Sequence, residues 1–117
     1  MNDGIKSVSI ENSEHYRWGD DCSGWHLLRR DDMSVIQERM PAGTSEKMHY
    51  HKLSRQFFFV LEGTATMDVN GERVVVEKNR GLEISPGVLH QLRNESMDEV
   101  SFLVFSVPKS HGDRYER

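Results

Sequence analysis

Apolar side chains along this sequence recur mostly at every second position, in short runs that end at glycine, proline, asparagine or aspartate. This alternation is typical of β-strands, in which successive side chains point to opposite faces of a sheet. No long stretch repeats with the period of about 3.6 residues that marks an amphipathic helix. Short strands separated by turn residues predict an all-β fold, either a barrel or a sandwich. The predicted strands cover residues 5–10, 25–30, 33–40, 57–61, 64–69, 72–76, 82–84, 89–93 and 99–107.

Turn-forming residues indicate where some of these strands end. Asn70-Gly71 separates two predicted strands and is the best hairpin signal in the chain, because both residues tolerate a positive φ. Pro108 ends the last strand, since proline has no backbone N–H to donate to a neighbouring strand. Residues 13–23 are expected to form an ordered loop.

The chain of 117 residues is long enough for one compact domain with one hydrophobic core. No internal repeat or low-complexity linker divides it. We expect an N-terminal strand and loop over residues 1–24 that packs on the barrel, the barrel itself over residues 25–108, and a polar tail over residues 109–117. A small barrel can hold one ligand in its mouth.

Charge and composition narrow the classes of partner. The net charge is −4 and the charges are mixed and scattered, so no basic stripe predicts nucleic-acid binding. The longest apolar run, residues 57–61, is too short to cross a bilayer, and the N-terminus lacks the features of a secretory signal. Cys22 is the only cysteine, which favours a reducing cytoplasm and a structural role for that side chain. Small molecules and a second copy of the chain are the expected partners.

Two histidines one residue apart are the first candidates for chemistry. His49 and His51 would project from the same face of a strand, and His90 follows a Pro-Gly turn much later in the chain. Three imidazoles can occupy three corners of the coordination sphere of a divalent Zn, Ni, Fe, Mn or Cu ion. Taken alone, the His49 and His51 pair fits a polar loop without a metal at least as well.

The spacing around these histidines resembles the first signature of the cupin superfamily. That signature is a glycine, five residues, His-x-His, three or four residues, an acidic ligand, six residues and a glycine. Its places are taken here by Gly43, His49, His51, Gln56 and Gly63. Glutamine stands where the acidic ligand is usual.

The segment SPGVLHQLRN, residues 85–94, is similar to the second cupin signature, with Ser85 in the place of a usual proline. The two signatures occur in the expected order, with the Asn70-Gly71 hairpin between them. The resemblance spans roughly residues 25–108 and implies a single cupin barrel, a double-stranded β-helix or jelly roll, which commonly pairs into homodimers.

The resemblance also implies one divalent metal held by His49, His51, Gln56 and His90, a three-His, one-Gln set like that of the small pectin-degradation cupins. Those proteins act on unsaturated uronates, so the resemblance favours Lewis-acid chemistry on a small, oxygen-rich, anionic sugar acid or keto-sugar, by isomerisation, ring opening or lyase chemistry. A metal-dependent dioxygenase is an alternative, and a non-catalytic sugar-binding or sensor protein is another. Val104 stands where the pectin-degradation cupins carry an acidic residue, which counts against the same reaction.

Three further residues are candidates for catalysis. Glu38 and Arg39 are adjacent in a predicted strand, so only one can face the barrel interior, either Glu38 as a base or Arg39 as an anchor for an anion. His111 lies in the tail with Asp113 and Arg114, where these residues could move a proton or hold a carboxylate. A solvated tail and a solvated strand face are the alternatives.

The other notable residues are expected to be structural. Phe57 to Phe59 should belong to a strand buried on one face by the core and on the other by a partner subunit, with Gln56 and Phe58 facing inward. His15 and His26 are expected on the surface or in loops, and Asn94 is expected to support the loop that carries His90.

Overall fold

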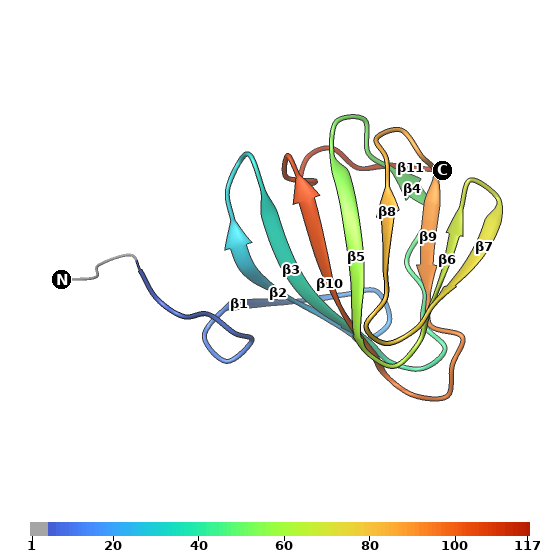
Figure 1. Ribbon diagram of the computed structural model, residues 1–117, viewed down its shortest axis with the longest axis horizontal. Helices are drawn as coiled ribbons and strands as arrows, with labels where there is room; N and C mark the ends of the chain where they lie inside the picture. The colour runs from blue at the N-terminus through green and yellow to red at the C-terminus, as the bar shows by residue number, and fades with distance from the viewer. Residues whose placement is uncertain (1–4) are drawn as a thin grey trace.

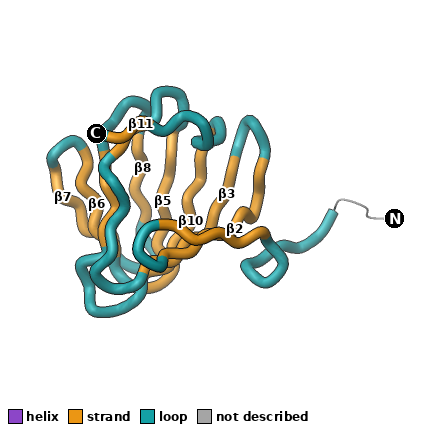
Figure 2. The backbone as a smooth tube through the Cα atoms, turned by 180° about the vertical axis from the view of Figure 1, so that it is seen from behind, coloured by secondary structure: helices purple, strands orange, loops and turns teal. Residues whose placement is uncertain are grey.

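The computed structural model describes residues 5–117, which form eleven β-strands and no helix. Two antiparallel sheets curve around a shared interior, as in a jelly roll (Figures 1 and 2). One sheet has the strand order β1-β2-β3-β10-β5-β8 and the other has the order β11-β4-β9-β6-β7. The strands are β1 (Glu14–Trp18), β2 (Cys22–Arg29), β3 (Ser34–Met40), β4 (His49–Tyr50), β5 (Arg55–Glu62), β6 (Ala65–Val69), β7 (Glu72–Val76), β8 (Gly81–Ile84), β9 (His90–Arg93), β10 (Val100–Val107) and β11 (Tyr115–Glu116).

Strand register sorts the side chains of the larger sheet into an inner and an outer face. Phe58 lies opposite Val104, and Val60 lies opposite Phe102, and all four side chains are buried. Their neighbours in sequence point outward, so Phe57 is exposed on the other face, as the alternation predicts. The inward side chains form one core between the two sheets. Its fully buried members include Met40, Val60, Met67, Val100 and Phe102.

The interior changes from apolar to polar along β5 and β10. Val60 and Phe102 lie in the core, whereas Gln56 and Ser106, which are also buried, lie opposite each other near the other end of the same strands. A polar pair that is buried at this end needs hydrogen-bond partners or a ligand. The open end of the barrel is therefore the place where a functional site can form.

The Asn70-Gly71 hairpin is confirmed. Asn70 has a φ of 51° and Gly71 a φ of 88°, and these two residues link β6 to β7. Positive φ at both central residues is the geometry of the tight turn that matches the twist of paired strands.

The prediction for the N-terminal region is wrong in two places. Residues 5–10 form no strand, and the segment expected to be an ordered loop contains β1 and the start of β2. β1 has the sequence EHYRW and lies at the edge of its sheet, where polar side chains face solvent on one side. The alternation of apolar and polar residues in β1 is therefore weak, and its pairing with β2 could not be predicted from the local sequence.

Residues 5–117 contain no helix that is long and apolar enough to cross a membrane.

Phe102 is the largest fully buried side chain, so its truncation tests the described core. We expect Phe102→Ala to lower the free energy of unfolding by about 3–5 kcal/mol, because a cavity remains where the ring was. Urea denaturation followed by circular dichroism measures this loss. Met97→Ala is the control, because this side chain is 91% exposed, and should change stability by less than about 0.5 kcal/mol. Equal effects of the two variants would contradict the described core.

Candidate metal centre

The three predicted histidines meet at the open end of the barrel. His49 on β4 lies directly opposite His90 on β9, so the strand pairing alone places the two rings on the same face, 4.4 Å apart between centroids. His51 follows β4, and its ring centroid lies 4.9 Å from that of His49 and 5.7 Å from that of His90. One nitrogen from each ring lies within 4.8 Å of the corresponding nitrogen of the other two. All three side chains are buried.

Backbone carbonyl groups fix the orientation of each ring. The Nδ1 atoms of His49, His51 and His90 lie 2.8, 2.8 and 2.9 Å from the carbonyl oxygens of Lys47, Asp113 and Val88. A carbonyl oxygen only accepts, so each Nδ1 must carry the hydrogen and each Nε2 must hold a free electron pair. The Nε2 atoms of His51 and His90 are buried and have no hydrogen-bond partner.

Gln56, on β5 of the opposite sheet, offers its amide oxygen as a fourth candidate metal ligand. Its Nε2 atom donates to the Oγ of Ser106 over 3.0 Å, which fixes the orientation of the amide. The Oε1 atom is buried and has no partner. Orphaned acceptors of this kind cost free energy in a folded protein unless a ligand satisfies them. The three imidazoles and the amide oxygen therefore fit a divalent transition metal.

Burial keeps the imidazoles neutral, as metal ligands must be. It lowers the pKa of His49 to about 3 and that of His90 to about 4, and the hydrogen bonds to backbone carbonyls only partly oppose this effect. Burial also lowers the pKa of His51. All three rings are therefore unprotonated at neutral pH.

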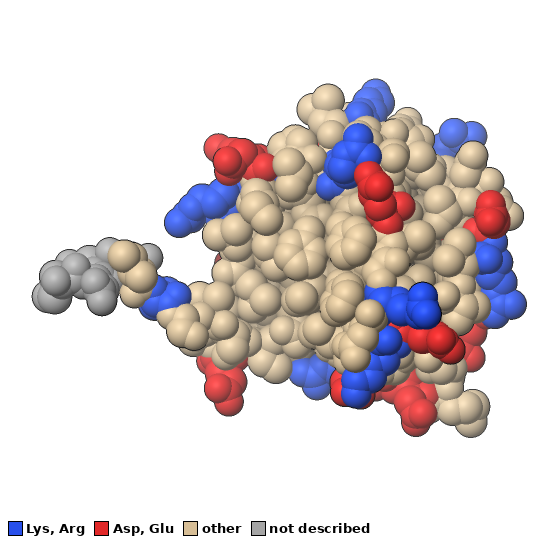
Figure 3. All heavy atoms as spheres, viewed as in Figure 1, with Lys and Arg blue, Asp and Glu red and all other residues tan. Residues whose placement is uncertain are grey.

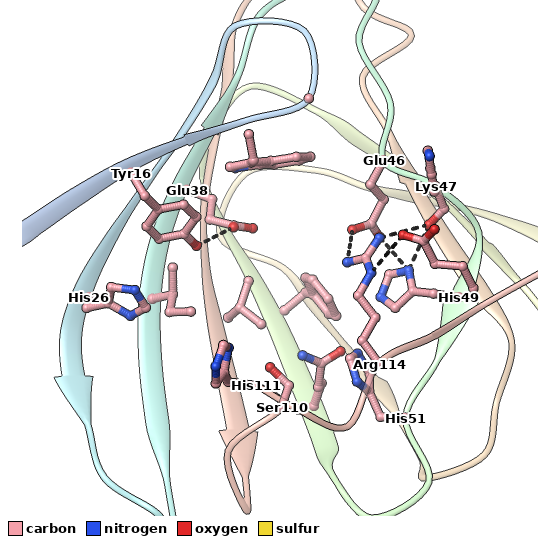
Figure 4. Close-up of a pocket in the computed structure, with 18 of the residues that line it drawn as sticks. Tyr16, His26, Glu38, Glu46, Lys47, His49, His51, Ser110, His111 and Arg114 are labelled. Atoms are coloured by element: carbon pink, nitrogen blue, oxygen red, sulfur yellow. Dashed lines mark hydrogen bonds and ion pairs between the residues drawn. The ribbon is translucent and has the colours of Figure 1, made fainter.

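A cavity of about 770 Å³ opens beside His49 and His51, between the two sheets and the C-terminal segment (Figure 4). This volume suits a small molecule of metabolite size. His49 and His51 line one wall. The larger sheet forms the facing wall, with Gln56 on β5 and with Tyr16, His26, Ile36 and Glu38 on β1, β2 and β3.

Glu38 points into this cavity and Arg39 does not. Met40 is in the core, and Glu38 shares its face of β3. The guanidinium of Arg39 lies on the outer face, 4.8 Å from the ring centroid of Trp25 and 3.7 Å from the carboxylate of Glu99. Of the two alternatives left open by the sequence, the structure therefore brings Glu38 to the candidate site.

Tyr16 holds the Glu38 carboxylate in place. Its hydroxyl donates to Glu38 over 2.9 Å. The phenol ring lies against Gly24, where a Cβ atom would come within 2.3 Å of the ring, so only glycine leaves room for it. Burial raises the pKa of Glu38 to about 7, although the hydrogen bond from Tyr16 and the charge of Arg114 oppose the shift. Burial also raises the pKa of Tyr16, which keeps the phenol protonated.

The tail places its three candidates in different environments. His111 is exposed at the rim of the cavity. Arg114 lines the cavity, with its guanidinium 3.9 Å from the carboxylate of Glu46 and 3.4 Å from that of Glu116. Asp113 is buried, and its carboxylate contacts the backbone of residues 52–54 instead of the cavity.

Tyr16, His26 and Glu46 line the cavity but were not predicted as site residues. Tyr16 lies in the segment that was expected to be a loop. His26 was expected on the surface or in a loop, but it lies opposite Ile36 and lines the cavity with it. Glu46 accepts the backbone N–H of Leu92 over 3.0 Å, and burial raises its pKa to about 8. Its place shortly before His49 was the only sequence signal for it.

Asn94 does not support the loop that carries His90, as was expected, but a different turn. Its side-chain amide donates to the carbonyls of Met40 and Asp98, and its oxygen accepts from Ser96. These contacts brace the turn after β9, whereas His90 lies at the start of β9.

The two sheets and the three-histidine cluster beside Gln56 define a β-barrel of the cupin type with a candidate metal site. A family model described as "Cupin domain" matches residues 36–106, and the chain belongs to this family. An uncharacterized protein of Streptomyces coelicolor is 28% identical over 106 residues, which are 91% of this chain and all of that protein.

Two solved structures show the same fold at low sequence identity. A predicted oxalate decarboxylase from Thermotoga maritima superimposes with a TM-score of 0.81 at 17% identity, over 89% of this chain and 100% of that one. A structure described as a sugar phosphate isomerase from a cupin superfamily, from Silicibacter pomeroyi, gives a TM-score of 0.77 at 20% identity, over 89% of this chain and 76% of that one.

Removal of one imidazole tests the metal centre. We expect purified protein loaded with Ni²⁺ or Zn²⁺ to hold one ion per chain, and His51→Ala to lose it, because two imidazoles and an amide bind weakly. Plasma emission spectroscopy of desalted protein measures the content. His26→Ala is the matched control, because this histidine lines the same cavity on the other wall and should leave the metal content unchanged. Equal metal content in wild type and His51→Ala would contradict the assignment.

Proposed function

We propose that this cupin is a metal-dependent enzyme that moves a proton on a small, anionic, oxygen-rich substrate such as a sugar acid or keto-sugar. The observation that carries the proposal is that Glu38, a half-buried carboxylate, lines the same cavity as His49 and His51 of the histidine cluster, on the facing wall. A metal site alone would fit many activities. A metal site that faces a carboxylate with a pKa of about 7 fits acid–base chemistry at neutral pH.

A divalent ion held by three imidazoles and an amide, all neutral donors, would keep its full charge and act as a Lewis acid on a substrate carbonyl or hydroxyl oxygen. Glu38 would take the proton from the carbon next to that carbonyl. Tyr16 holds the Glu38 carboxylate by a hydrogen bond and so limits its motion. Returning the proton to a neighbouring carbon gives isomerisation, and loss of a neighbouring group gives a lyase reaction.

Arg114 supports the choice of an anionic substrate. Its guanidinium lines the cavity, and its positive charge lowers the pKa of each of the three cluster histidines, after the larger effect of burial. An arginine can bind a carboxylate or phosphate with two parallel hydrogen bonds. Arg114 would therefore hold the charged end of a substrate whose carbonyl lies near the histidines.

Proton abstraction has a direct test that requires no knowledge of the product. Metal-loaded protein is mixed with a panel of uronates and keto-sugars in D₂O, and proton NMR follows loss of the signal from the carbon next to the carbonyl. Exchange that depends on protein and metal supports the proposal. Oxygen consumption without exchange would contradict it and favour a dioxygenase, and binding without exchange or oxygen consumption would favour a sensor.

Glu38→Gln should slow this exchange by about 10²–10⁴-fold and leave the metal content unchanged, because the amide cannot accept the proton. In wild type the rate should rise with pH through about 7, as Glu38 loses its proton, and then level off. The charged and titratable groups around Glu38 are Tyr16, Cys22, Glu46 and Arg114. Tyr16 stays protonated throughout this range, and burial raises the pKa of the Cys22 thiol. A rate independent of Glu38 would contradict its role as the base.

The expected homodimer would use the outer face of the larger sheet. Leu28, Val35, Phe105 and Phe57 form one row across β2, β3, β10 and β5. Phe57 is 41% exposed, and Val107, on the same face of β10 as Phe105, is 51% exposed. Figure 3 shows a broad uncharged area over these strands with charged residues around its rim. A second copy of the same sheet would cover this face.

Phe57→Glu should therefore convert a dimer of twice 13.6 kDa into a monomer, because it places a charge within the apolar face. Light scattering after size-exclusion chromatography measures the mass. Val75→Glu is the control, since Val75 is 52% exposed on the other sheet and should leave the dimer intact. A monomeric wild type would contradict the proposed interface.

A further inference from the structure

The C-terminal segment, residues 113–117, lies against the part of the chain that carries the histidines. β11 pairs with β4, with Tyr115 opposite Tyr50 and Glu116 opposite His49. The backbone N–H of Arg117 donates to the carbonyl of Met48 over 3.1 Å. This segment therefore extends the smaller sheet beyond the strand on which His49 lies.

Asp113 makes the most extensive contacts of this segment. Its carboxylate accepts the backbone N–H groups of Lys52, Leu53 and Ser54 over 3.0, 2.9 and 2.9 Å. Its own carbonyl oxygen accepts Nδ1–H of His51 over 2.8 Å. Asp113 is only 8% exposed, so these four hydrogen bonds form largely away from water.

These contacts reach two of the four metal donors. The carbonyl of Asp113 sets the tautomer and the orientation of His51. The loop of residues 52–54, held by the carboxylate, joins His51 to β5, where Gln56 is the second residue. Since the Asp113 carboxylate points at the loop backbone, its contribution is to the geometry of the donors and not to contact with a substrate.

We propose that residues 113–117 form a latch whose docking on residues 48–54 positions His51 and Gln56 for the metal, with Asp113 as the positioning residue. The inference rests on the metal site of the proposed function. A docked latch pre-orients the donors, so it strengthens metal binding. By thermodynamic linkage, the bound metal must then stabilise the docked latch by the same factor.

The expected coupling between metal binding and docking of the latch can be estimated, because Asp113 is a hydrogen-bond partner of the candidate metal ligand His51. Loss of such partners typically weakens metal binding by about 10- to 100-fold. In Asp113→Ala, three backbone N–H groups lose their acceptor, and the segment that presents its carbonyl to His51 is no longer anchored. The donors then have to be ordered when the metal binds, which lowers the affinity.

The affinity for Zn²⁺ tests the forward coupling, measured by competition with a chromogenic chelator. Asp113→Ala should bind Zn²⁺ about 10- to 100-fold more weakly than wild type, and Asp113→Asn, which keeps one oxygen acceptor, should lie between them. Asp32→Ala, an exposed aspartate in the turn between β2 and β3, is the matched control and should bind as wild type does. If Asp113→Ala does not fold, Asp113→Asn carries the test.

Amide hydrogen exchange in the wild type, followed by NMR, tests the reverse coupling. Saturating Zn²⁺ should slow exchange at residues 52–54 and at Arg117 by the same factor of about 10 to 100. The latch would be overturned, with the metal centre intact, if both Asp113 variants bound Zn²⁺ as tightly as the wild type does. It would also be overturned if Zn²⁺ left the exchange at these amides unchanged. Absence of Zn²⁺ binding by the wild type would overturn the metal centre and the latch together.

Discussion

Burial of unpaired acceptor atoms is the constraint on which the candidate site depends. Three backbone carbonyls hold the Nδ1–H groups of His49, His51 and His90, and Ser106 holds the amide of Gln56. The Nε2 atoms of His51 and His90 and the Oε1 atom of Gln56 then have no hydrogen-bond partner, and each such buried polar atom costs about 1–3 kcal/mol. A cation at their meeting point removes this cost. The hydrogen bonds that orient the three imidazoles and the Gln56 amide therefore also favour the binding of a cation between them.

The division of the barrel interior explains how one small domain accommodates both a core and a reactive site. β5 and β10 run from the apolar core at Val60 and Phe102 to the polar end at Gln56 and Ser106. The same alternation that places Met40 in the core places Glu38 in the cavity. Glu38 is buried enough for its pKa to rise to about 7, yet Tyr16 supplies the hydrogen bond that keeps its orientation defined. Stability and reactivity therefore use different ends of the same strands.

Most of the fold was predictable because its strands carry a strong alternation of apolar and polar residues. The predicted strands from residue 25 onward have counterparts in the structure, and the Asn70-Gly71 turn has the positive φ values that its residues favour. β1 was missed because an edge strand with polar residues on its exposed side shows little of this signal. The short strands β4 and β11 were missed because two residues are too few to show any period.

The sequence by itself predicted His49, His51, Gln56 and His90 as the metal ligands, because the spacing of the two cupin signatures is a local property of the chain. It also determined that Glu38 and Arg39 point in opposite directions, since strand geometry is local. Only the tertiary structure decided which of the two faces the cavity, because that depends on the register of β3 against β2 and β10. It also brought Tyr16 and Asp113 to their partners, 22 and 62 residues away in sequence, through contacts that no local pattern encodes.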